Sequence, residues 1–134
     1  MLSMTSARVC RRVAVVDDDE SICEALSSLL RSAGYQCSVF TSAETFLASG
    51  GLSGADCLVL DVQMKGMSGL DLQAKVRESN MKIPIIYLTA NYNEHVRTHA
   101  LRHGAIAVLG KPVTHELLLR AIGDATSGWH HNPS

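Results

Sequence analysis

Apolar residues recur along the chain in two alternating patterns, short continuous runs and longer stretches with helical spacing. Short apolar runs bounded by polar residues or glycine are typical of buried β-strands. These runs predict strands over residues 13–16, 36–40, 57–61, 83–88 and 106–109. The stretches between them have the spacing of helices with one apolar face. In the first helix, that face is formed by Ile22, Leu26, Leu29, Leu30 and Ala33.

Polar residues and glycines mark where the helices begin and end. Asp19 is placed to cap the first helix, and Gly34 is placed to end it. Thr41 and Glu44 have the spacing of a capping box, which predicts a short second helix. Thr114 is placed to cap the last helix. The predicted apolar face of that helix consists of Leu117, Leu118, Ala121, Ile122 and Ala125.

Five strands that alternate with five helices predict an α/β fold, a doubly wound, five-stranded parallel sheet with helices on both faces. A chain of 134 residues is long enough to form one such domain with its own core. We expect residues 1–10 to be a flexible lead-in, residues 11–127 to form the domain, and residues 128–134 to be a short tail.

Composition narrows the class of protein. The chain is 46% hydrophobic and 19% charged with a net charge of −1, which is typical of a soluble globular protein. A near-neutral charge gives no reason to expect binding to nucleic acid or to a membrane surface. We see no secretory signal and no apolar run long enough to span a bilayer. Four scattered cysteines without a CxxC spacing favour a cytoplasmic location.

Polar residues that end the predicted strands carry the candidate chemistry. They are Asp17, Asp18, Asp61, Thr89 and Lys111. The carboxyl ends of parallel strands lie along one edge of a sheet, so these side chains should converge. Three neighbouring carboxylates favour a hard divalent cation, Mg²⁺ or alternatively Mn²⁺. A metal, an ammonium group and a hydroxyl suit phosphoryl transfer, with Asp61 as the nucleophile.

Five short motifs on these strand ends resemble those of the receiver domains of two-component response regulators. They are Val15–Asp18, Leu60–Met64, Gly66–Gly69, Leu88–Ala90 and Lys111–Pro112. The resemblance covers nearly the whole chain and implies the flavodoxin-like receiver fold. It implies that Asp61 is the phosphoacceptor and, with Asp18, a direct metal ligand. The backbone carbonyl of Gln63 would be a further ligand, and Asp17 would act through water.

The resemblance also assigns residues that would bind and sense the phosphoryl group. Thr89, Ala90 and Lys111 match the phosphoryl-binding and switch positions. Gln63 and Asn91 match positions that tune hydrolysis of the aspartyl phosphate, and both are amides here. Their effect on the lifetime of the phosphoryl group stays open.

Two positions differ from the usual receiver pattern. Lys65 replaces a proline, which predicts a less rigid loop or, alternatively, a cation that reaches the acidic site. Val108 replaces the tyrosine or phenylalanine whose ring usually turns inward upon switching. Because valine cannot make that movement, we expect altered coupling to the output surface.

The resulting hypothesis is a phosphorelay signal transducer that assists its own phosphorylation and dephosphorylation rather than an enzyme. A histidine kinase would phosphorylate Asp61, with Mg²⁺ as the cofactor. An output protein or a missing C-terminal output domain would read the change, and a homodimer could form through the fourth helix, fifth strand and last helix. The alternatives are a degenerate receiver that serves as a docking module and a Mg²⁺-dependent phosphatase that acts through an aspartyl phosphate.

Three histidines at helical spacing, His95, His99 and His103, suggest a second hypothesis, a Zn²⁺ or Ni²⁺ site. The alternative is a polar outer face, with Val96 and Leu101 directed toward the core.

Overall fold

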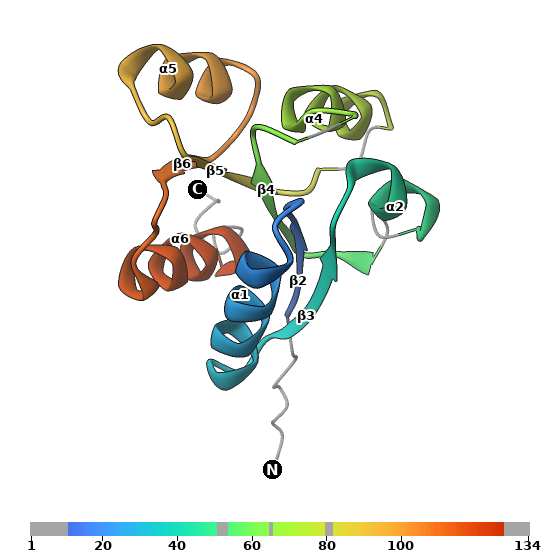
Figure 1. The fold of residues 1–134 in the computed structure, drawn as a ribbon. Coiled ribbons are helices and arrows are strands. Elements are labelled where there is room, and N and C mark those ends of the chain that lie inside the picture. The colour runs from blue at the N-terminus through green and yellow to red at the C-terminus, as the bar shows by residue number, and fades with distance from the viewer. Residues whose placement is uncertain (1–10, 51–53, 65, 80–81, 128–134) are drawn as a thin grey trace.

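The fold is a five-stranded parallel sheet between two layers of helices, which confirms the predicted class (Figure 1). The structure, a computed structural model, describes residues 11–50, 54–64, 66–79 and 82–127. In chain order the elements are β2 (Arg12–Val16), α1 (Glu20–Ser32), β3 (Gln36–Phe40), α2 (Ala43–Ala48), β4 (Cys57–Asp61), α4 (Gly69–Glu78), β5 (Ile85–Thr89), α5 (Glu94–Arg102), β6 (Ala107–Gly110) and α6 (His115–Ser127).

The strands are arranged in the order β3-β2-β4-β5-β6, and every neighbouring pair is parallel. The order reverses between β2 and β4, because β3 lies on one side of β2 and the later strands lie on the other. Ligands of open α/β sheets bind at such a reversal, outside the carboxyl ends of the strands. Asp17 and Asp61 flank this point.

Each face of the sheet has its own hydrophobic core. On one face, side chains of α2, α4 and α5 pack against the sheet, and Phe46, Leu72 and Ala100 are among those buried there. On the other face, α1 and α6 contribute buried side chains that include Leu26 and Ile122. Figure 1 shows α1 and α6 together on that side. A fully buried leucine or phenylalanine stabilises the fold by about 1.5–3 kcal/mol, so these two layers hold the strand ends in place.

The predicted strands are correct in number and order, but three of them have other bounds in the structure. The first, β2, begins one residue earlier than predicted, at Arg12. The strand predicted over residues 83–88 begins at Ile85, because Pro84 has no N–H to donate to the sheet. The Pro84 carbonyl still accepts a hydrogen bond from Leu58 N at 2.9 Å. The strand predicted over residues 106–109 is β6, Ala107–Gly110, and the preceding Ile106 is 47% exposed.

Helix ends also correct the sequence interpretation. Ser42, not Thr41, caps α2, because its side chain accepts a hydrogen bond from Thr45 N at 3.0 Å. Asp19 caps α1 as predicted, but Ala33 at its end is exposed and does not join the apolar face. Leu117, in the first turn of α6, is 50% exposed because the face toward the sheet is formed by other residues, including the fully buried Leu118 and Ile122.

A buried polar network ties β5 to α4 and α5. The hydroxyl of Tyr87 donates to Gln73 Oε1, and Gln73 Nε2 donates to the carbonyl oxygen of His103 at 2.6 Å. Tyr87 is fully buried and Gln73 is 2% exposed. His103 follows α5, where helix carbonyls have no partner within the helix. The network therefore fixes the carboxyl end of α5 against α4.

Among the described residues, every helix is too short or too polar to cross a bilayer.

Candidate functional site

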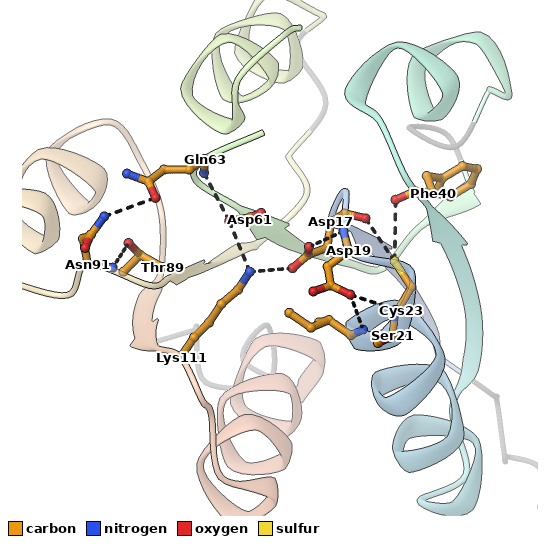
Figure 2. Close-up of polar contacts among 11 residues, drawn as sticks. Asp17, Asp19, Ser21, Cys23, Phe40, Asp61, Gln63, Thr89, Asn91 and Lys111 are labelled. Atoms are coloured by element: carbon orange, nitrogen blue, oxygen red, sulfur yellow. Dashed lines mark hydrogen bonds and ion pairs between the residues drawn. The ribbon is translucent and has the colours of Figure 1, made fainter. Parts of the chain in front are cut away.

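Four neighbouring strands bring the predicted polar residues to one edge of the sheet (Figure 2). Asp17 follows β2, Asp61 is the last residue of β4, and Thr89 is the last residue of β5. Lys111 follows β6, and its N–H donates to the Thr89 carbonyl at 2.8 Å. The parallel register thus assembles side chains that lie far apart in the sequence.

Asp17 is the most deeply buried acid of the site, at 1% exposure. One carboxylate oxygen, Oδ1, accepts a hydrogen bond from Asp19 N at 2.9 Å. The other, Oδ2, is 2.8 Å from Lys111 Nζ. Since a buried carboxylate needs charged or hydrogen-bonding partners, these two contacts account for its position.

Asp61 lies beside Asp17 and is 4% exposed. Its Oδ1 accepts a hydrogen bond from Gln63 N at 3.1 Å and lies 3.4 Å from Lys111 Nζ. Burial, together with the negative charge of Asp17, raises the pKa of Asp61 to about 6, although Gln63 N–H and Lys111 oppose this shift. The ionised form of Asp61 is therefore short of positive charge.

Lys111 is the cation that these two acids share. Burial alone would lower the pKa of its ammonium group, but the hydrogen bond and charge of Asp17, with a smaller contribution from Asp61, raise the pKa above its usual value. Lys111 therefore stays protonated, with its Nζ pointing at both carboxylates (Figure 2).

The donor set fits a hard divalent cation. Carboxylate oxygens of Asp17, Asp18 and Asp61 lie within 4.8 Å of one another, and no other group of three potential ligand residues is this close within the described ranges. Asp18 is exposed, so a metal could keep water ligands on that side. Oxygen donors with retained waters are what Mg²⁺ prefers. A divalent cation would also neutralise the acids that Lys111 alone does not balance.

Thr89 and the two amides form the side of the site next to β5. Thr89 is 1% exposed, and its hydroxyl accepts a hydrogen bond from Asn91 N at 3.0 Å. The Asn91 side chain donates to Gln63 Oε1 at 3.3 Å, so the two predicted tuning residues contact each other. Ala90, which lies between Thr89 and Asn91 in the sequence, is exposed. Among the contacts of the described residues, the Thr89 hydroxyl only accepts, so its hydrogen can be donated to an incoming oxygen.

Three further contacts support the site, and sequence reasoning predicted none of them. A side chain at Gly69 would place Cβ 2.4 Å from the Asp61 carbonyl oxygen, so the start of α4 packs directly on the end of β4. Glu44 accepts a hydrogen bond from Met67 N at 3.0 Å and so holds the loop after Asp61. The Cys23 thiol donates to the Asp17 carbonyl at 3.2 Å. The motif that contains Gly69 and the capping pattern that contains Glu44 do not predict these contacts, because each contact depends on chain packing.

Of the two residues that depart from the usual receiver pattern, the structure describes only Val108. Val108 is buried in the core below α5 and is paired with Tyr87 in the sheet register. Lys65 lies outside the described residues, so the prediction about its loop stays a prediction.

The described structure does not support the hypothesis of a metal site formed by three histidines. The rings of His99 and His103 are 4.3 Å apart, but His95, His99 and His103 do not form a group of three converging ligands in the described chain. Val96 and Leu101 are partly buried, which agrees with a polar outer face of α5.

Comparison with known proteins decides the family. A family model for the response regulator receiver domain matches residues 13–123. The chain belongs to the response regulator receiver family. Receiver domains are components of two-component signalling, and the motif resemblance found in the sequence is thereby confirmed.

Similar receivers occur in longer proteins. The response regulator TmoT of Ectopseudomonas mendocina is 43% identical over 113 residues, which are 84% of this chain and 51% of TmoT. TodT of Pseudomonas putida is 41% identical over 110 residues, which are 82% of this chain and 48% of TodT. The chain thus spans about half the length of these curated relatives.

Solved structures share the fold. The response regulator StyR has 40% sequence identity and a TM-score of 0.81, covering 89% of this chain and 60% of StyR. The chemotaxis protein CheY4 of Vibrio cholerae has 28% identity and a TM-score of 0.81, covering 87% of this chain and 99% of CheY4.

Proposed function

We propose that the receiver accepts a phosphoryl group on Asp61 from the phosphohistidine of a histidine kinase. The observation that carries this proposal is the placement of Asp61, buried beside Asp17 and Asp18 and 3.4 Å from the ammonium group of Lys111. A carboxylate held next to a cation and a metal-binding set of acids is a nucleophile positioned for a phosphoryl donor.

The reaction transfers one phosphoryl group without net oxidation or reduction. A carboxylate oxygen of Asp61 forms a bond to phosphorus, and the bond between phosphorus and the histidine nitrogen breaks. The imidazole nitrogen keeps the electron pair of the broken bond and takes up a proton from solvent, which leaves a neutral histidine. Lys111 would then donate to one phosphoryl oxygen and Thr89 to another, which stabilises the charge on these oxygens.

Asp18, Asp61 and the backbone carbonyl of Gln63 would bind the metal directly, and Asp17 would bind it through water. When bound, Mg²⁺ or Mn²⁺ supplies positive charge to the phosphoryl oxygens. Gln63 and Asn91, which contact each other, border the place where a water molecule would attack the aspartyl phosphate. We propose that this pair sets the lifetime of the phosphorylated state.

Intact-mass spectrometry after incubation with acetyl phosphate tests the proposal. With Mg²⁺ present, we expect the mass of the chain to increase by one phosphoryl group, and Asp61→Asn to abolish the increase. Asp124→Asn is the matched control, because Asp124 is an exposed aspartate on α6. No increase in the wild-type chain, or the same increase in Asp61→Asn, would refute the assignment.

The second candidate is a docking module that is not phosphorylated, which the substitution at Val108 favours. An absent mass increase together with intact binding to a histidine kinase would support this candidate. Sustained hydrolysis of added phosphoesters would instead indicate a phosphatase. In either case Asp61 would not act as a signalling phosphoacceptor.

We further propose that residues 11–127 act as one signalling unit in the cytoplasm. The relatives are about twice as long as the matched region, so a C-terminal output domain or a separate output protein would read the signal. The surface formed by α5, β6 and α6 would contact that output or a second receiver in a homodimer. We expect the receiver itself to contact neither nucleic acid nor membrane.

A further inference from the structure

A pocket of about 250 Å³ lies between the carboxyl ends of α4 and α5, at the opposite edge of the sheet from the acidic site. Both helices cover the same face of the sheet (Figure 1). The polar wall of the pocket is formed by Gln73, Arg77, Lys82, Arg102 and His103. Its apolar wall includes Val76, Ile83 and Ile85. This pocket shares no lining residue with the proposed phosphorylation site.

The charged side chains that line the pocket are all cations. Arg77, Lys82 and Arg102 line it, and no carboxylate does. Within the described ranges, none of these three cations forms an ion pair. A protein surface usually intersperses charges of both signs, so three unpaired cations around one hollow favour an anionic ligand.

Helix dipoles explain only part of this arrangement. Arg77 and Arg102 lie in the last turns of α4 and α5, where cations offset the negative end of a helix. Each helix end carries roughly half a negative elementary charge, so the two ends together offset about one cation. Of the three positive charges on Arg77, Lys82 and Arg102, about two are therefore not offset by the helix ends. The pocket therefore keeps a surplus that a bound anion would neutralise.

The buried network of Gln73 fixes the shape of the pocket. Gln73 lines the pocket and also belongs to the buried network, in which it donates to the His103 carbonyl and accepts from Tyr87. Because a carbonyl oxygen can only accept, Nε2 of Gln73 must face His103, and the orientation of the amide is determined. This network holds the two helix ends at a set separation, so a ligand would not need to order them.

Size and chemistry define the class of ligand. At about 250 Å³ the pocket is smaller than the roughly 300–1,000 Å³ of sites for drug-sized molecules. Two arginine side chains offer planar donor groups that match phosphate or carboxylate oxygens. Phosphate and carboxylate groups share this chemistry.

We propose that the pocket between α4 and α5 binds a small anion that carries phosphate or carboxylate groups. This site is separate from the proposed phosphorylation of Asp61 and does not depend on it. Arg77 and Arg102 are the main ligands, and Lys82 adds charge at the rim.

Titration of the full chain with pyrophosphate, inorganic phosphate and citrate, followed by two-dimensional NMR, tests the proposal. Divalent metals are first removed from the chain on a chelating resin, so an added anion has no metal to bind at the acidic edge and no dissolved chelator competes for the pocket. We expect saturable shifts in the amide and guanidinium signals of Arg77 and Arg102. Stronger binding of the two phosphates would identify phosphate as the preferred group, and stronger binding of citrate would identify carboxylate.

The double substitution Arg77→Gln with Arg102→Gln should weaken the tightest anion at least tenfold. Arg120→Gln is the matched control, because Arg120 is an exposed arginine on α6 outside the pocket, and it should change affinity less than twofold. Equal weakening in the control, or binding of all three anions that disappears at physiological salt, would show general charge attraction and overturn the site. Shifts confined to Asp61 and Thr89, or no saturable shift, would also overturn it.

Discussion

Asp61 illustrates how one side chain can oppose the stability of the fold that positions it. Its carboxylate is buried and borders Asp17, and the only nearby counter-charge among the described contacts is the shared Lys111. The proposed phosphoryl transfer needs a reactive carboxylate at Asp61, which a complete balance of its charge would not provide. A bound metal or a phosphoryl group with its metal would relieve that imbalance.

The stability of the metal-free chain should therefore depend on the ionisation of Asp61. The pKa of Asp61 is raised from 3.8 to about 6, so between these values the folded chain holds a proton that the unfolded chain has released. The free energy of unfolding then falls as pH rises through this range. We expect Asp61→Asn in EDTA to stabilise the chain by about 1–3 kcal/mol at pH of about 7.5 and much less at about pH 4.

Urea unfolding of both chains at the two pH values measures this effect. Asp124→Asn, which changes an exposed acid, should change the free energy of unfolding by the same small amount at both pH values. An equal stabilisation by Asp61→Asn at both pH values would contradict the raised pKa.

At the scale of elements, the helix α5 is held unevenly. Its carboxyl half is fixed by the buried Ala100, by the Gln73 bond to His103, and by a hydrogen bond from Ile106 N to Ile85 O at 2.9 Å. Residues 90–95, which lead into the helix from Thr89, are all exposed. A change at Thr89 therefore meets less resistance at the amino end of α5 than at its carboxyl end.

Gln73→Leu should remove the fixed end of α5. The substitution leaves the His103 carbonyl without its buried donor, and a buried polar group without a partner costs about 1–3 kcal/mol. We expect a loss of stability of that size in urea unfolding and faster amide exchange over residues 100–104. Gln36→Leu, on the exposed surface of β3, should change stability by less than about 0.5 kcal/mol. Unchanged exchange at these residues in Gln73→Leu would refute the anchoring role.

The helices and strands, and the polar residues that follow the strands, could be predicted from sequence. The spacing of apolar residues and the residue types determine them locally. Asp17, Asp61, Thr89 and Lys111 follow apolar runs, so topology alone brings them together. Contacts that depend on how chain segments pack left no such pattern. One example is Gly69, where the Asp61 carbonyl leaves no room for a side chain. Another is Glu44, which accepts a hydrogen bond from Met67 N rather than completing a capping box.

At the scale of the whole molecule, two sites of opposite charge lie at opposite edges of the sheet. The carboxyl edge carries the acids Asp17, Asp18 and Asp61, and the opposite edge carries the basic pocket between α4 and α5. The net charge of −1 hides this separation. Each edge is therefore suited to a different class of ion, a cation at one and an anion at the other.

Mg²⁺ should stabilise the whole domain by binding to its folded state. A ligand present at 100 times its dissociation constant stabilises by about 2.7 kcal/mol. We expect the thermal unfolding temperature to rise by several degrees at saturating Mg²⁺, and Asp18→Asn to remove most of the increase. Asp124→Asn should retain it. A Mg²⁺ response that is the same in Asp18→Asn would contradict the assigned ligand set.

The contact between Gly69 and the end of β4 has a consequence for how this chain can vary. Even the methyl group of alanine would collide with the backbone of Asp61, and backbone cannot rotate away as a flexible side chain can. Any side chain at this position therefore forces the end of β4 to move, and the carboxylate proposed to accept the phosphoryl group would move with it.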